Sequence, residues 1–119
     1  MLTNLLYEEK EDLKIAGCWV HCRRKFHDAL EVIPKDLRKQ SVLYLIMNQI
    51  RAIYREEGKL SGLSSDERTA RRQLVVKPLV DAFFAYLKQN SDRVPKSGKT
   101  KEAFTYALNQ ERYLLLIVK

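Results

Sequence analysis

Apolar residues recur along residues 19–33 at the spacing of one helix face, so this stretch is predicted to be an amphipathic helix. Its apolar members stand three or four positions apart: Trp19, Cys22, Phe26, Ala29, Leu30 and Ile33. The residues that fall on the opposite side are charged: Arg23, Arg24, Asp28 and Glu31. Pro34 is expected to end this helix, because proline lacks the N–H that a continuing helix needs.

Two further stripes of the same period predict helices in the middle and second half of the chain. The first stripe consists of Leu43, Ile46, Met47, Ile50, Ile53 and Tyr54. Arg51 and Arg55 fall outside that stripe. The next helix is predicted to begin at a capping box, in which the Ser64 hydroxyl accepts from the N–H of Glu67. Pro78 lies inside the apolar pattern that follows, so we expect a kink there or a break into two helices.

A last helix is predicted after the loop 90–98, with Ser97 as its N-cap. One stretch, Ile15 to Val20, reads as a short strand, and a strand without a partner cannot form a sheet. The predicted fold class is therefore all-α, a small helical bundle of about four helices. The short N-terminal strand is kept as an alternative for the first residues of that bundle.

The net charge of the chain indicates what kind of partner it binds. The chain of 119 residues has 22 Lys and Arg against 15 Asp and Glu, a formal net charge of +7, which favours a polyanion such as DNA or RNA. The charge is uneven: Met1–Asp12 is acidic, whereas the basic runs are Arg23–Lys25, Arg68–Arg72 and Lys96–Lys101. Runs on separate helices either converge into one face that follows phosphates or remain solvated surface.

Several other classes of protein are disfavoured. No apolar run reaches the roughly 20 residues that a membrane span needs. The stretch Met1–Lys14 is too acidic and too interrupted for a signal peptide. Two cysteines at positions 18 and 22 do not form a disulfide framework. The expected location is therefore the cytoplasm, with no membrane partner.

The segment GCWVHCRRKF, residues 17–26, concentrates residue types that carry chemistry. Zinc is an obvious candidate, but a second ligand pair from elsewhere in the chain is missing for Cys18, His21, Cys22 and His27. A cysteine nucleophile would need a histidine base oriented by a third polar group. The segment SGKT, residues 97–100, lacks the first glycine of a phosphate-binding loop. The prediction is no metal site and no catalytic residue.

Three stretches, taken in order, carry a more specific pattern. They are GCWVHCRRKFHDAL, IYREEGKLSGLSSDERTARRQLVVKPLVDAFFAYL and PKSGKTKEAFTYALNQERYLLL. The first resembles the Gly-Cys-Trp-x-His-x-Arg-Arg-Lys-Phe segment of transposases of the insertion sequence sixty-six family. The second resembles that family's Tyr-x-x-Glu helix with the Glu-Arg-x-x-x-Arg helix after it, and the third its Ser-x-x-x-x-Ala-x-x-Tyr-Ala-Leu-Asn segment. The resemblance covers nearly the whole chain from Ile15 on.

That resemblance implies a parent enzyme with a ribonuclease-H-like core, in which two aspartates and a glutamate hold divalent metal such as magnesium for DNA strand transfer. In the family pattern both aspartates precede the Gly-Cys-Trp segment and the glutamate follows the last helix. Asp12, Asp28 and Glu111 stand in no matching context. The resemblance therefore implies a segment without a cofactor of its own: an acidic N-terminal extension at 1–14 and a helical insertion domain at 15–119.

The leading hypothesis is a transposase fragment that contributes DNA contact or assembly and is not an enzyme by itself. Its expected partners are DNA, bound weakly and without sequence preference, the rest of a transposase core, and a second copy in a homo-oligomer. The predicted DNA-contacting residues are Arg23, Arg24, Lys25, Arg68, Arg71 and Arg72. A structural motif at a strand-to-helix junction is predicted for Cys18, Trp19, His21 and Phe26. The alternatives are a stand-alone basic nucleic-acid-binding regulator and an interaction module for an acidic protein.

Overall fold

The computed structural model describes the backbone of residues 2–118 and the side chains of residues 13–118. Within that part of the chain every regular element is helical, which confirms the all-α prediction. The α-helices are α1 (Leu2–Val32), α2 (Val42–Gly58), α3 (Ser65–Arg71), α4 (Lys77–Asn90), α5 (Lys99–Asn109) and α6 (Glu111–Leu114). The tighter or wider helical turns between them are η1 (Lys35–Gln40), η2 (Arg72–Val76), η3 (Ser91–Arg93) and η4 (Leu115–Val118).

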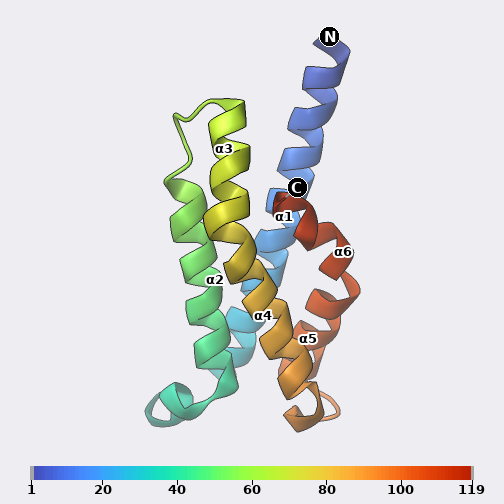
Figure 1. Ribbon diagram of the computed structural model, residues 1–119. Helices are drawn as coiled ribbons and strands as arrows, with labels where there is room; N and C mark the ends of the chain where they lie inside the picture. Colours follow the sequence, from blue (N-terminus) through green and yellow to red (C-terminus); the bar gives the residue numbers. More distant parts are fainter. Residues whose placement is uncertain (1, 119) are drawn as a thin grey trace.

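The helices form an elongated bundle of 50 × 23 × 22 Å. α1 is the long central element, and its first turns extend beyond the ends of α2 and α3 (Figure 1). α2 and α5 both pack against α1, and α4 packs against α2. The C-terminal turn η4 returns to α1, so both ends of the described chain lie toward the same end of the bundle (Figure 1).

Five aromatic rings from α1, α4 and α5 form the centre of the core. They are Trp19, Phe26, Phe83, Phe84 and Phe104, each at most 2% exposed. Neighbouring rings lie 5.0–6.4 Å apart between centroids, in tilted or edge-to-face arrangements that aromatic pairs prefer. The apolar stripes predicted for residues 19–33 and 43–54 both face this core.

The short strand expected at Ile15 to Val20 is wrong, because these residues are the middle of α1. GCWVHCRRKF is accordingly a continuous helical segment and not a strand-to-helix junction. A lone strand would leave its N–H and C=O groups unpaired, whereas a helix satisfies them internally. The helix also places Ile15 and Trp19, four residues apart, on one buried side, where they are 7% and 1% exposed.

The boundary proposed between residues 14 and 15 lies inside α1, which continues through it without a break. The side chains of residues 1–12 lie outside the described residues, so the acidic N-terminal extension stays a prediction. No helix in the described part of the chain is long and apolar enough to cross a membrane.

Pro78 breaks the regular helix as predicted, and the break has a defined form. The backbone widens into a π-helical turn at η2, where the N–H of Lys77 bonds the carbonyl of Arg72 five residues earlier. α4 then begins at Lys77, which puts Pro78 in a first turn that does not need its missing N–H. The wider turn also moves the Leu74 carbonyl away from the proline ring, with which it would clash in an α-helix.

Of the two predicted helix caps, one is confirmed. The Ser64 hydroxyl accepts a hydrogen bond of 3.2 Å from the N–H of Glu67 at the start of α3. The Ser97 cap is wrong: α5 begins one residue later, at Lys99, and its N-cap is Gly98 with φ of 97° and no side-chain cap. That left-handed conformation favours glycine, and it sets the register of the helix start.

Candidate nucleic-acid interface

The basic run on α1 lies on the outside of the bundle because its neighbours in the sequence fix the inside. Trp19, Cys22 and Phe26 are buried, so the intervening residues Arg23 and Arg24 must face outward, and both are exposed. The Arg23 guanidinium carbon lies 6.0 Å from the centre of the Tyr54 ring on α2. A cation over an aromatic face is held electrostatically while its N–H groups stay available to another ligand.

The Lys25 side chain extends from the flank of α1 that faces α5. It is exposed, and its Nζ lies 5.4 Å from the centre of the Tyr106 ring on α5. Consecutive helical residues are about 100° apart, so Arg23 leans toward α2, Lys25 toward α5, and Arg24 stands between them. None of the three forms an ion pair with a side chain in the range 13–118.

Two acidic residues follow this run on α1, and both are engaged nearby. His27 lies 3.6 Å from a carboxylate oxygen of Asp28 and 3.5 Å from one of Glu31. Arg38 also donates to the Glu31 carboxylate at 3.4 Å. Arg38 pairs with Glu31, and Arg23 and Arg24 outnumber Asp28 in the shallow hollow that they share with His27, so this hollow carries a net positive charge.

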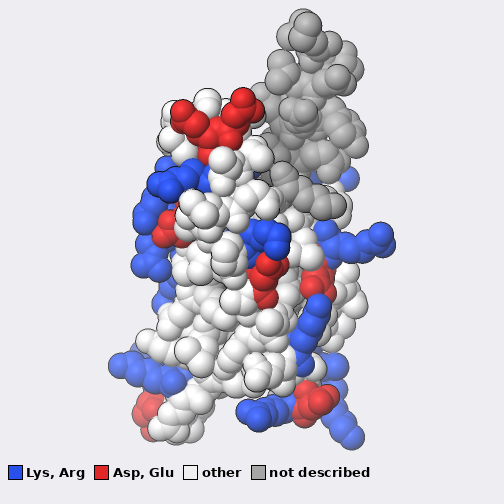
Figure 2. Space-filling model, viewed as in Figure 1, with Lys and Arg blue, Asp and Glu red and all other residues white. Residues whose placement is uncertain are grey.

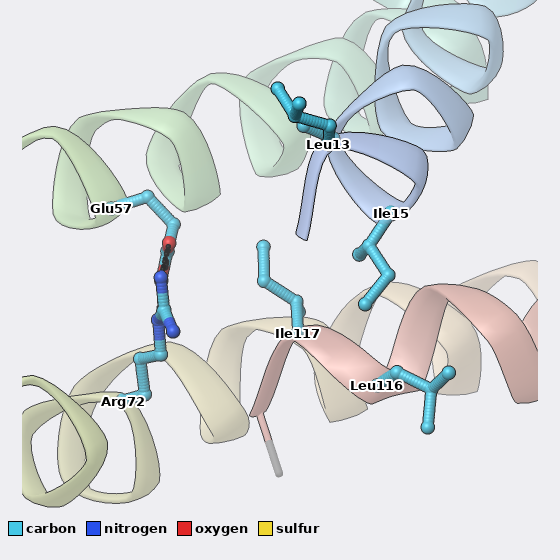
Figure 3. A pocket seen from close by; sticks show the side chains of 7 residues that line it. Leu13, Ile15, Glu57, Arg72, Leu116 and Ile117 are labelled. Carbon is cyan, nitrogen blue, oxygen red and sulfur yellow. Dashed lines mark hydrogen bonds and ion pairs between the residues drawn. The ribbon is translucent and has the colours of Figure 1, made fainter. Parts of the chain in front are cut away.

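The second basic run, on α3 and η2, is used mainly inside the protein. Arg68 is half-buried and donates to the carbonyl of Leu63 at 3.0 Å, which satisfies a loop carbonyl just before α3. Arg72 forms a two-armed ion pair with Glu57 of α2, with N–O distances of 3.0 and 2.9 Å. Figure 3 shows this pair beside a hollow lined by apolar residues of α1 and η4, including Leu13 and Ile117.

Arg71 is the exposed member of this second run. It lines a hollow between α2 and α3 together with Glu56 and Lys59. On α2, Glu56 stands two residues after Tyr54, which is more than half a turn around the helix. The two basic runs therefore lie on different sides of α2, so of the two alternatives that the sequence left open, one shared face is not formed by these residues.

The third basic run surrounds the start of α5. Lys99 and Lys101 line adjoining hollows with Lys25 of α1, and Glu102 borders both hollows. Asp28 borders one of them. The lysines there are mixed with carboxylates, so the local excess of positive charge is smaller than at Arg23 and Arg24.

The residues predicted as a structural motif divide between core and surface. Trp19 is buried and donates from its indole Nε1 to the carbonyl of Leu114 at 3.2 Å, which fixes α6 against α1. Phe26 is fully buried. Cys18 is half-buried, and its backbone carbonyl accepts from the Tyr106 hydroxyl at 3.5 Å. His21 is exposed.

Cys22 is buried and Glu111 is held in an ion pair. Burial raises the pKa of the Cys22 thiol to about 12, which keeps it protonated and unreactive at neutral pH. Among residues 13–118, no three His, Cys, Asp or Glu side chains converge as metal ligands. Glu111 of α6 is paired with Lys88 at 2.8 Å.

The DNA-contacting residues predicted from the sequence did not include two arginines that lie near the first run. Arg51 and Arg55 are exposed on α2, on either side of Tyr54 in the sequence. Lys and Arg side chains follow the outer edge of α2, whereas the front of the bundle over α4 is largely uncharged (Figure 2). Sequence reasoning had placed both arginines outside the apolar stripe, but only the contact between Arg23 and Tyr54 relates them to α1.

Comparison with known proteins gives a family and two distant relatives. Residues 4–119 match the family described as Transposase IS66 family. The uncharacterized protein y4qI of Sinorhizobium fredii (strain NBRC 101917 / NGR234) is 28% identical over 104 residues, covering 87% of this chain and 18% of that protein. The uncharacterized protein y4hP of the same strain is 26% identical over 115 residues, covering 90% of this chain and 21% of that protein.

This chain therefore spans about a fifth of the length of the curated relatives that it matches, at 18% and 21%. No solved structure matches it.

Proposed function

This chain belongs to the transposase IS66 family, and we propose that it is a helical segment through which such a transposase contacts DNA, without catalytic activity of its own. The observation that carries the proposal is the pair Arg23 and Arg24, exposed on α1 and without an ion pair among the described side chains. Guanidinium groups bind phosphate through two parallel hydrogen bonds, so unpaired exposed arginines suit a DNA backbone.

The proposed lack of catalysis is supported by what the chain's acids do. A transposase of the resembled type needs three carboxylates around divalent metal. Asp28 lies beside His27 on α1, and Glu111 is paired with Lys88 between α6 and α4. Neither stands in the family's catalytic context, and the side chain of Asp12 lies outside the described residues. The side chains of residues 13–118 therefore do not fit that metal centre.

Contacts to the phosphate backbone of DNA position a protein without reading the bases. We therefore expect this chain to bind duplex DNA weakly and with little sequence preference. Its affinity should fall as salt rises, because each neutralised phosphate releases counterions, with a slope of about −0.9 in log K against log salt per phosphate.

The test is a titration of labelled duplex DNA by fluorescence anisotropy at several salt concentrations. Replacing Arg23 and Arg24 by alanine should flatten the salt slope by up to about two units. A matched control is Lys35→Ala with Lys39→Ala, which removes the same charge from η1, where both lysines are exposed. No binding at low salt, or equal losses in both double variants, would overturn the proposal and leave an interaction module for an acidic protein as the better account.

A further inference from the structure

We propose that Arg51 and Arg55 of α2 join Arg23 and Arg24 of α1 in one two-helix surface that follows the phosphates of duplex DNA. We call these four residues the α1–α2 basic face. The inference rests on the proposed function and deepens it, because it names a contact surface that spans two helices instead of one run on α1.

The contact between Arg23 and Tyr54 shows how α2 is rotated relative to α1. The two helices pack together, and the Arg23 guanidinium carbon lies 6.0 Å from the Tyr54 ring centre. Tyr54 therefore marks the flank of α2 that borders the basic run of α1. Ile50 and Met47 lie one and two turns before Tyr54 and are buried in the core, so this flank is the edge where the core meets the surface.

Arg51 and Arg55 lie next to that flank of α2. Arg51 is three residues before Tyr54 and Arg55 is one residue after it, so both lie within about 100° of it around the helix. Both side chains are exposed. Arg51 donates only to the amide oxygen of Asn48, at 3.4 Å, and neither arginine has an ion pair with a described carboxylate.

Both acids at the end of α2 have cationic partners. Glu56 binds Lys59 at 3.0 Å, and Glu57, which lies near Tyr54 around the helix, binds Arg72 at 2.9 Å. On α1, Asp28 lies beside His27, and Glu31 is bound by His27 and Arg38. Of the acids named, Asp28 alone lacks a lysine or arginine partner among the described side chains, so the four arginines of the α1–α2 basic face outnumber it and the face keeps a net positive charge.

The make-up of this face favours DNA over an acidic protein. Protein interfaces, although enriched in Arg, are organised around buried aromatic or apolar anchors. The four residues of this face expose guanidiniums, and the Tyr54 ring beside them lies under Arg23. Guanidinium forks spaced along two adjacent helices suit a regular row of phosphates.

The experiment measures the salt dependence of duplex DNA binding for the whole chain and three variants. The test variant is Arg51→Ala with Arg55→Ala. The conservative variant is Arg51→Lys with Arg55→Lys, which keeps the charge. The control is Arg71→Ala with Arg112→Ala, which removes two exposed arginines from other surfaces. Circular dichroism and the unfolding midpoint verify that each variant is folded.

We expect the test variant to lose affinity by about tenfold or more at low salt and to flatten the slope by up to about two units. The lysine variant should keep most of the slope, and the control should match the parent chain. If alanine at Arg23 and Arg24 weakens binding while the test variant does not, the two-helix surface is wrong and the proposed function stands. If the parent chain binds no DNA, the proposed function itself has failed.

A competition experiment tests the alternative partner, an acidic protein. Polyglutamate, added at the same charge concentration as the DNA, should displace the chain poorly, because isolated carboxylates on a flexible chain lack the fixed spacing of duplex phosphates. Displacement by polyglutamate as effective as by unlabelled duplex would overturn the inference in favour of an acidic protein partner.

Discussion

The two basic runs at residues 23–25 and 68–72 look alike in the sequence but have different roles in the fold. On α1, Arg23 and Arg24 are exposed and lack ion pairs among the described side chains. On α3 and η2, Arg68 bonds a loop carbonyl and Arg72 binds Glu57. A run of basic residues in the sequence therefore indicates a DNA-binding surface only when its side chains lack partners within the protein.

The difference follows from where each run stands along its helix. The α1 run is in the interior of a long helix, where every backbone group is already bonded and the outer face has no other function. The α3 run stands directly after a loop with a free carbonyl and beside the last turn of α2, which carries Glu56 and Glu57. Arginines placed there find partners inside the protein, so their side chains stabilise the α2–α3 connection.

The largest expected effect is a difference in stability between two variants, each with an apolar residue next to one of the two runs replaced by alanine. Phe26→Ala should destabilise the protein by about 3–5 kcal/mol, because it removes a fully buried ring from the aromatic cluster. Leu74→Ala, in η2, should stay within about 0.5 kcal/mol, because Leu74 is 68% exposed. Chemical denaturation of both variants measures the difference. Equal losses of unfolding free energy in the two variants would contradict the exposed position of Leu74.

The next effect tests whether Arg72 is a structural residue. Arg72→Ala or Glu57→Ala should each cost about 1–2 kcal/mol, because each leaves a mostly buried charge without its partner. The double variant should lose little more than either single one, with a coupling energy of about 1 kcal/mol. The exposed pair of Lys77 and Asp81 is the matched control, with an expected coupling of about 0.3–0.5 kcal/mol. Equal coupling in the two pairs would contradict the structural role of Arg72.

A smaller effect tests the start of α3. Ser64→Ala should cost about 1 kcal/mol, because the N–H of Glu67 loses the hydroxyl that caps the helix. Ser65→Ala is the control, since this exposed residue is already inside α3. Thermal or chemical unfolding can resolve a difference of this size. A neutral Ser64 variant would mean that water caps the helix as well as the hydroxyl does.

The smallest expected effect is on the stability of the α1 run itself. Arg23→Ala with Arg24→Ala should change the free energy of unfolding by less than about 0.5 kcal/mol for each residue, because both side chains are exposed. Arg23 alone has a further contact to lose, over the Tyr54 ring. A loss of several kcal/mol, measured by denaturation, would give this run the structural role that we assign to Arg72.

Hydrophobic periodicity was enough to predict the helices and most of the core. The stripe from Trp19 to Leu30 and the stripe from Leu43 to Ile53 are buried as predicted, and the capping serine and the interrupting proline both act where their chemistry requires. These features depend on a residue and its near neighbours. The apolar run at Ile15 to Val20 was misread, because a short apolar stretch fits a strand as well as a buried helix face.

The candidate interface was less predictable than the fold, because it depends on contacts between helices. The exposure of Arg23 and Arg24 followed from the helical stripe. The internal use of Arg72 did not, since Glu57 is 15 residues away in sequence. The proximity of Arg51 and Arg55 to α1 also required the packing of Tyr54 against Arg23.

The central claim is that this chain meets DNA through arginines of α1 and not through those of α3. Its most direct test is chemical modification of arginine with phenylglyoxal, with and without saturating duplex DNA at low salt, read residue by residue by mass spectrometry. Arg23 and Arg24 should be protected by DNA, while exposed Arg71 should be modified at the same rate in both samples. Protection of Arg71 without protection of Arg23 and Arg24, or no protection of any arginine, would contradict the account.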